Sequence, residues 1–210
     1  MFAKEAICEH PARLPLPIAA ADDGRMTRRR RLPTFFRPAE AETLLAALRS
    51  EQHRLIILTG LFLGLRVSEI THLDVADVDC DRGTVLVRHG KGDRDRQVPM
   101  PHRLWEGLRA WIGERKAGYL FPSPRGGGRL SSRSVQRLIK RAAGRAGIAG
   151  VDVPRKITPH KLRHTYATRL LDTGANIREV QELLGHASVA TTEIYCHVSG
   201  DRLRGAVDRL

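Results

Sequence analysis

The sequence predicts an α+β fold that is mostly helical and carries one small antiparallel sheet. Segments with helical spacing of apolar side chains, bounded by capping residues, follow one another along most of the 210 residues. One pair of short alternating segments, joined by a turn that contains glycine, predicts a hairpin. Hydrophobic residues make up 41% of the chain, which is enough for a core. These patterns together favour helices packed around one small sheet.

Two helices are expected before the hairpin. Order should begin near Leu32, and residues 37–50, RPAEAETLLAALRS, predict the first helix because Pro38 suits a first helical turn and the leucines share a face. Arg54–Leu65 is apolar nearly all round, which predicts a buried central helix. This segment leads directly into RVSEITHL, residues 66–73.

The hairpin and further helices follow. Thr84–Arg88 and Arg96–Met100 are the expected strands, and the turn between them contains the tripeptide GKG. The chain after the hairpin is predicted to be helical, because a proline or a capping residue opens each segment and glycine closes several of them. The expected helices are residues 101–112, 131–147, 159–174, 177–185 and 187–198.

The two ends of the chain differ from the middle. Residues 1–31 have no sustained period, contain several prolines and end in four arginines, so we expect a flexible basic arm, with a disordered leader as the alternative. The final DRLRGAVDRL has an apolar stripe at helical spacing, which predicts a tail helix. The predicted organisation is an arm over 1–31, one domain over 32–198 and a tail helix over 199–210.

The charge of the chain favours a polyanionic partner. There are 36 Lys and Arg residues against 23 Asp and Glu residues, a formal net charge of +13. Most of the basic residues are arginine, which binds phosphate through a planar fork and stays charged. Nucleic acid is the commonest polyanionic partner. A codon bias that produces a solvated basic surface is the alternative explanation.

Cysteine use and hydropathy predict a cytoplasmic protein. Cys8, Cys80 and Cys196 are scattered and form no CxxC pair, so we expect reduced thiols. No run approaches the roughly 18 consecutive apolar residues of a membrane span, so no membrane partner is expected. Prolines and acidic residues interrupt the N-terminal stretch that a signal peptide would need.

Two basic residues occupy unusual positions. Arg66 ends a nearly all-apolar segment and needs an anionic partner, which Glu69, three residues on, could supply in a purely structural ion pair. Lys91 lies between two glycines at the tip of the predicted hairpin, where the backbone can approach a ligand closely. A solvated turn lysine is the alternative for Lys91.

The stretch PHKLRHTY combines histidine and arginine. On a helix, His160 and Arg163 are neighbours and can converge on one small anion. His160 and His164 have the i,i+4 spacing that a zinc site could use. However, no glutamate follows His160, as the HExxH arrangement requires, and no acidic third ligand is obvious. We therefore predict neither a metal nor a cofactor.

These stretches in order resemble a known family. LGLRVSE, GKG in a hairpin, HKLRH, LLGH and a tyrosine nine residues later resemble the catalytic domain of the tyrosine recombinases, the phage integrase and Xer family. The resemblance extends from about Leu32 to Val198 and implies the catalytic-domain fold of that family. Only about thirty residues precede Leu32, whereas most members carry a separate core-binding domain there. In this respect the chain is similar to the short fimbrial-switch invertases.

The resemblance implies a nucleophile and a phosphate clamp. Tyr195 would attack a DNA phosphodiester, release a 5′-hydroxyl and leave a 3′-phosphotyrosine. Arg66 and Arg163 would bind the non-bridging oxygens, whose negative charge grows in the transition state.

The resemblance also implies residues that move protons. Lys91 would protonate the leaving 5′ oxygen, and His160 would help to accept the tyrosine proton. His186 would donate a hydrogen bond to the phosphate. Glu69 would orient Arg66 through an ion pair.

The leading hypothesis is a site-specific DNA recombinase of the integrase, invertase or resolvase type. One alternative is a relaxing enzyme of the type IB topoisomerase kind, which rejoins the same strand. Others are a catalytically weak or inactive DNA-binding regulator and a zinc hydrolase. The implied partners are double-stranded DNA and further copies of the chain, which would form a tetramer on paired sites and remain monomeric when free. An accessory DNA-bending protein or a second recombinase would be a further partner.

Overall fold

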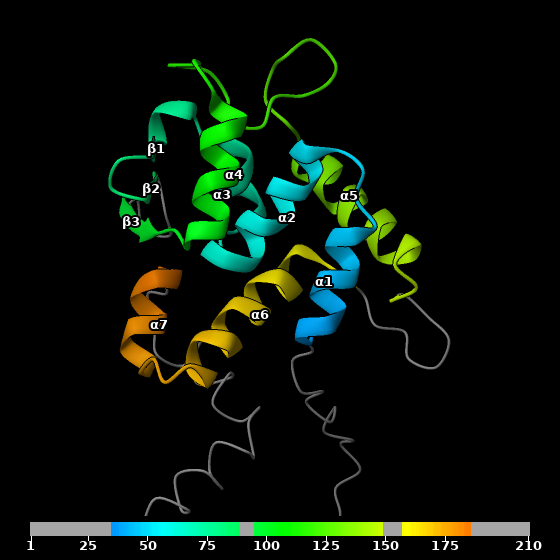
Figure 1. The fold of residues 1–210 in the computed structure, drawn as a ribbon, viewed down its shortest axis with the longest axis vertical. Helices are drawn as coiled ribbons and strands as arrows, with labels where there is room; N and C mark the ends of the chain where they lie inside the picture. The colour runs from blue at the N-terminus through cyan, green and yellow to red at the C-terminus, as the bar shows by residue number, and fades with distance from the viewer. Residues whose placement is uncertain (1–34, 89–94, 149–156, 186–210) are drawn as a thin grey trace, which may run out of the picture. The chain divides into compact units, whose positions relative to one another are not determined.

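The computed structural model describes residues 35–88, 95–148 and 157–185. It confirms the mostly helical α+β class with one small antiparallel sheet (Figure 1). The elements in chain order are α1 Pro38–Ala46, α2 Glu51–Leu63, α3 Val67–His72, the 3₁₀ turn η1 Val75–Asp77, β1 Val78–Asp79, β2 Thr84–Val87, β3 Arg96–Pro99, α4 His102–Ile112, α5 Ser132–Arg145, α6 Pro159–Asp172 and α7 Ile177–Leu184.

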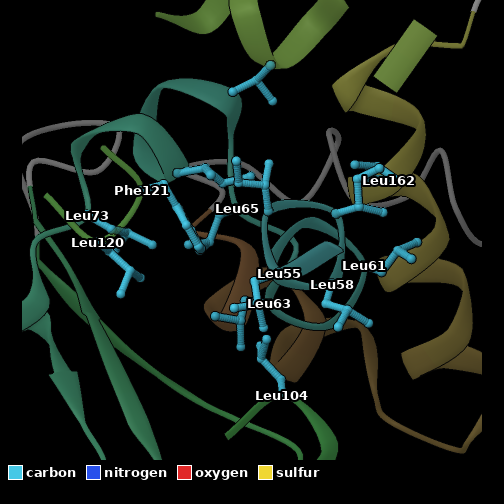
Figure 2. Packing of buried hydrophobic residues seen from close by; sticks show 14 of the residues in the cluster. Leu55, Leu58, Leu61, Leu63, Leu65, Leu73, Leu104, Leu120, Phe121 and Leu162 are labelled. Carbon is cyan, nitrogen blue, oxygen red and sulfur yellow. The ribbon is translucent and has the colours of Figure 1, made fainter. Parts of the chain in front are cut away.

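Helix α2 is the centre of the core, as its apolar sequence predicted. It packs against α6 and α4 and also touches α3 and α5. Figure 2 shows leucines of α2 pointing outward in several directions, with Leu104 of α4 and Leu162 of α6 among their neighbours. At Gly60 a Cβ atom would lie 2.8 Å from Leu162 Cδ1, so the absence of a side chain lets α6 approach closely.

Both predicted ends of the central helix, Arg54 and Leu65, were wrong. It begins at Glu51 after Ser50, and it stops at Leu63 because Gly64 adopts a left-handed conformation with φ 60°. A second, short helix, α3, then begins at Val67. Arg66 therefore does not end the apolar helix. It is the N-cap residue of α3, with an extended backbone conformation.

The sheet has three strands, one more than the sequence predicted. Its order is β1-β2-β3 and both pairs are antiparallel, with Val85 opposite Val98 and Val78 opposite Val85. Strands β2 and β3 coincide with the predicted hairpin and each ends one residue earlier. Strand β1 is two residues long, too short to show an alternating pattern.

The capping residues set the predicted starts of two later helices. Ser131 Oγ accepts a hydrogen bond from the Ser134 backbone N–H at 3.1 Å, and α5 begins at the next residue, Ser132. Asn176 Oδ1 accepts from the backbone N–H groups of Arg178 and Glu179, both at 3.0 Å, and α7 follows. These caps satisfy backbone donors that have no partner inside the helix.

Several predictions fall outside the described residues. They concern the N-terminal arm, the GKG turn, the helix expected over 187–198 and the tail helix, and they stay predictions. Within the ranges that the structure does describe, no helix has both the length and the apolar character of a membrane span.

Replacing Gly64 by alanine is expected to destabilise the fold far more than replacing Gly83. Both glycines have positive φ, 60° and 64°, so alanine costs about 1–2 kcal/mol of backbone strain at either position. A Cβ at Gly64 would also clash with the Tyr166 ring and lie 2.9 Å from Leu184 Cδ2, whereas nothing lies within 4 Å at Gly83. Overpacking adds about 1–3 kcal/mol at Gly64. Urea unfolding measures the free energy of unfolding of both variants. Equal losses in the two would contradict the close packing of Tyr166 and Leu184 against Gly64.

Candidate active site

A buried carboxylate, Glu69, organises the site. Glu69 lies in the first turn of α3, where its Oε2 accepts the backbone N–H of Arg66 at 2.7 Å. Its Oε1 accepts a second hydrogen bond at 2.7 Å from Nη1 of the same arginine. The Glu69 side chain is only 5% exposed and that of Arg66 is 26% exposed. The ion pair predicted from the three-residue spacing is therefore confirmed.

A second arginine, Arg96, binds the same carboxylate, and this contact was not predicted from the sequence. Its Nη1 and Nη2 donate to Oε1 and Oε2 of Glu69 at 3.1 and 3.0 Å. Arg96 is the first residue of β3, and strand alternation places it on the same face as the buried Val98. That alternation was the available signal, because an arginine on the buried face of a strand needs an acidic partner.

Arg163 of α6 completes the group. Its Nη1 lies 3.9 Å from Glu69 Oε2, and its side chain is 6% exposed. We call Glu69 with Arg66, Arg96 and Arg163 the Glu69 cluster. Three guanidinium groups face one carboxylate, so the cluster carries excess positive charge.

The arginines keep Glu69 ionised. Burial alone would raise the pKa of its carboxyl, but the hydrogen bonds and charge of Arg96, with those of Arg66, overcome this effect and hold the pKa below its usual range. Glu69 is consequently a carboxylate near neutral pH and binds the guanidinium groups through charged hydrogen bonds.

The same arginines bind the carboxyl end of α7. Arg96 Nε donates to the Leu183 carbonyl at 3.1 Å, Arg163 Nη2 to the Leu184 carbonyl at 2.6 Å and Arg66 Nη2 to the Gly185 carbonyl at 3.3 Å. These carbonyls lack partners within the helix and lie at its partially negative end.

Arg163 also binds the end of α2. Its Nη1 donates to the Gly64 carbonyl at 2.7 Å. One side chain on α6 therefore joins the carboxyl ends of two helices that are far apart in the sequence. Figure 1 shows α6 beside α7, in agreement with their direct contacts.

A cavity of about 510 Å³ gathers the candidate residues that the structure describes. Arg66, His160 and Arg163 all line it, together with Gln136 and Lys140 of α5. His160 is exposed, near the start of α6, whereas Arg163 is buried one turn later. Arg66, His160 and Arg163 therefore line one cavity, and their catalytic roles stay predictions.

Three candidates lie outside the described residues: Lys91, His186 and Tyr195. His186 is the residue that follows Gly185 in the chain. The last described contact of the Glu69 cluster, with the Gly185 carbonyl, therefore lies one residue before His186 in the chain.

The metal alternative rests on His160 and His164. His164 is partly buried, and this burial, followed by the charges of His160 and Arg163, lowers its pKa. In the described parts of the chain, no three His, Cys, Asp or Glu side chains gather so that they could hold a metal ion.

Two of the three tyrosines of the chain are described. Tyr166 is buried against Gly64, and burial raises the pKa of its phenol to about 12, which disfavours the phenolate. Tyr119 is 38% exposed and its backbone pairs with Asp74.

Comparison with known proteins identifies the family. The phage integrase family matches residues 34–202, most of the chain. The chain belongs to the phage integrase family. The tyrosine recombinase XerA of Thermococcus kodakarensis is 41% identical over 86% of this chain and 64% of its own length. The tyrosine recombinase XerD of Ralstonia nicotianae is also 41% identical, over 83% of this chain and 59% of its own length.

Solved structures agree with this membership of the phage integrase family. A crystal structure of a XerA recombinase aligns with a TM-score of 0.73 at 33% identity, covering 88% of this chain and 65% of its own. The XerH site-specific recombinase bound to a palindromic difH substrate, a post-cleavage complex, aligns with a TM-score of 0.69 at 29% identity, over 84% and 53%. The resemblance to tyrosine recombinases and the predicted fold are confirmed. The chain spans about three fifths of the length of these curated relatives.

Proposed function

We propose that the chain acts as a site-specific DNA recombinase that cleaves and rejoins strands through a 3′-phosphotyrosine. The observation that carries this proposal is the convergence of Arg66, His160 and Arg163 on one cavity. Glu69 and the ends of two helices hold both arginines in place. This supports a role for the two cations in stabilising the negative charge that a phosphodiester would gain in the transition state. Membership of the phage integrase family supports the same reaction.

The proposed reaction breaks one ester bond and forms another. The phenolic oxygen of Tyr195 attacks the phosphorus, and the bond from phosphorus to the 5′ oxygen breaks. His160 helps to accept the phenol proton and Lys91 donates a proton to the leaving oxygen. Arg66 and Arg163 bind the non-bridging oxygens.

The phosphotyrosine ester makes the step reversible. His186 donates a hydrogen bond to the phosphate, and a 5′-hydroxyl from a second strand then displaces the tyrosine. The ester conserves the bond that was broken, so the proposed reaction uses no nucleotide cofactor.

Helix α5 supports double-stranded DNA as the partner. Its exposed face carries five basic residues: Arg133, Arg137, Lys140, Arg141 and Arg145. Lys140 also lines the cavity with the two clamp arginines. Exposed cations on this helix, one of them at the cavity, suit a phosphate backbone, and binding is expected to weaken steeply with salt.

The proposal includes an organisation and an assembly. Residues 1–31 form a basic arm, 32–198 the catalytic domain and 199–210 a tail helix. The apolar stripe of the tail has to be buried, and packing on its own domain is one alternative. From the resemblance to the family we propose instead that the tail docks on a neighbouring copy, which would join four copies on paired DNA sites. We propose that the free chain is monomeric, because the ten residues 201–210, which carry the apolar stripe, bury too little surface to hold an interface. Two chains that each carry a net charge of +13 also repel each other. An accessory DNA-bending protein or a second recombinase is a further proposed partner.

Covalent capture tests the proposed function. The chain is incubated with genomic DNA fragments in EDTA and, in a parallel sample, with a divalent metal; it is then denatured in SDS and isolated, and the attached DNA is sequenced. We expect recurrent fragments bound through a 3′-phosphotyrosine. Absence of any SDS-resistant complex would contradict the proposal, and DNA cleavage that requires a divalent metal would favour the hydrolase alternative. Relaxation of any supercoiled plasmid, without strand exchange between captured sites, would favour a topoisomerase.

Lys91→Ala is expected to slow cleavage of an ordinary phosphodiester by about a hundredfold to ten-thousandfold, the usual contribution of a general acid. A substrate whose 5′ bridging oxygen is replaced by sulfur should restore the rate, because a thiolate leaves without a proton. Single-turnover cleavage of both substrates is the measurement. Lys116→Ala, which changes an exposed lysine just after α4, is the matched control. Equal defects of Lys91→Ala on the two substrates would deny Lys91 the acid role.

A further inference from the structure

We infer that Arg96 is a positioning residue that holds α3, whose N-cap residue is Arg66, to the end of α7. This inference rests on the proposed recombinase function and adds to it a residue outside the proposed catalytic set. Arg96 does not line the cavity, so it acts through its neighbours.

The first segment that Arg96 holds is α3. Its two terminal nitrogens bind both oxygens of Glu69, and Arg66 binds the same two oxygens through its side chain and its backbone. A carboxylate bound on both oxygens from two sides cannot rotate without breaking several charged hydrogen bonds. Arg96 thereby fixes the direction in which Glu69 holds the Arg66 guanidinium beside the cavity.

The second segment is the end of α7. Arg96 Nε donates to the Leu183 carbonyl, so each of the three guanidinium nitrogens of Arg96 donates a hydrogen bond. Gly185 lies against the same side chain: a Cβ there would be 3.0 Å from Arg96 Nη1, and its φ is 63°. Arg96 therefore sets the place where the chain leaves α7, one residue before His186.

Only arginine meets these demands. The Arg96 side chain is 12% exposed, and it binds two carboxylate oxygens and one carbonyl in different directions within one plane. Lysine has a single ammonium on a flexible stem and cannot reproduce this planar arrangement, although it keeps the charge. Arg96→Lys therefore tests geometry separately from charge.

Arg103 provides a matched control. Its Nη1 and Nη2 bind the two oxygens of Glu42 at 2.8 and 3.2 Å, the same paired arrangement as Arg96 with Glu69. The Arg103 and Glu42 side chains are exposed on the surface, at 46% and 59%. Arg103→Lys thus makes the same chemical change in an ion pair that touches neither α3 nor the end of α7.

The experiment has two arms on the full chain. The first is amide hydrogen exchange of the wild type, Arg96→Lys and Arg103→Lys without DNA. The second is single-turnover formation of the covalent adduct at saturating concentrations of a DNA fragment captured by the wild type. The second arm records the rate, the final fraction of protein that reacts and the DNA dissociation constant.

Arg96→Lys is expected to accelerate exchange in both α3 and the end of α7. It should slow adduct formation by about tenfold to a hundredfold, as large as the loss when a residue that orients a metal ligand is replaced. The reacting fraction and the DNA dissociation constant should stay near those of the wild type. A merely structural defect would instead lower the reacting fraction. Arg103→Lys should match the wild type throughout.

Unchanged exchange at either segment, or an unchanged rate of adduct formation, would overturn the role of Arg96. A wild type that forms no adduct would instead refute the proposed function, and the exchange arm would still decide whether Arg96 holds α3 to α7. If Arg96→Lys does not fold, Glu69→Gln serves as the second variant, because it weakens the same contact from the other side. It should produce the same pattern of exchange and rate.

Discussion

Tyr195→Phe is expected to bind DNA with wild-type affinity and to form no covalent adduct. The substitution removes only the phenolic oxygen that would become the phosphate ester, and the size and charge of the side chain stay the same. Labelled DNA is followed by native gel shift for binding and by SDS gel for the adduct.

The matched control for this variant is Tyr119→Phe. Tyr119 is the exposed tyrosine of the described chain, and its link to Asp74 is through the backbone. Tyr119→Phe should therefore keep full adduct formation. The assignment of the nucleophile would be refuted if Tyr195→Phe formed an SDS-resistant adduct. It would also be refuted if Tyr119→Phe formed none.

Arg66→Ala and Arg163→Ala are each expected to slow cleavage by about a hundredfold or more, the usual cost of losing one preorganised partner of a developing oxyanion. Their effects on stability should differ. Arg163 is buried and binds the carbonyls of Gly64 and Leu184, so its loss leaves two buried acceptors unpaired, at about 1–3 kcal/mol each. Arg66 is a quarter exposed, and its loss should cost less.

Single-turnover cleavage and urea unfolding separate these effects. Arg82→Ala is the control, because Arg82 is 79% exposed and its ion-pair distance to Asp79 is a long 3.9 Å. Near-normal cleavage by Arg66→Ala or by a folded Arg163→Ala would remove that residue from the proposed clamp. Equal stability losses in the two variants would contradict the role of Arg163 in joining α2 to α7.

Local patterns in the sequence were sufficient for part of the site. The Arg66–Glu69 pair follows from a spacing of three residues, and His160 and Arg163 share a helix that begins at a proline. The buried central helix and the β2–β3 hairpin follow from apolar periodicity in the same way. Each of these interactions is decided within a few residues of chain.

Contacts between distant segments were not predictable. Arg96 reaches Glu69 across 27 positions and Arg163 reaches the Gly64 carbonyl across 99, and no local period encodes either contact. The break between α2 and α3 was missed for a related reason. Gly64 lies in an apolar run that could continue a helix, and the Tyr166 ring that leaves no room for a side chain at Gly64 belongs to another helix.

The close approach of Gly185 to Arg96 restricts how this chain can vary. Any side chain at position 185 would need both a strained backbone and a displaced guanidinium, and displacing that guanidinium would unsettle Glu69. Conversely, a smaller residue at position 96 would leave Glu69 buried without its main partner. Libraries that randomise one position at a time should therefore recover the starting residue at 69, 96 and 185. A different set of residues at positions 69, 96 and 185 would require simultaneous changes at all three positions.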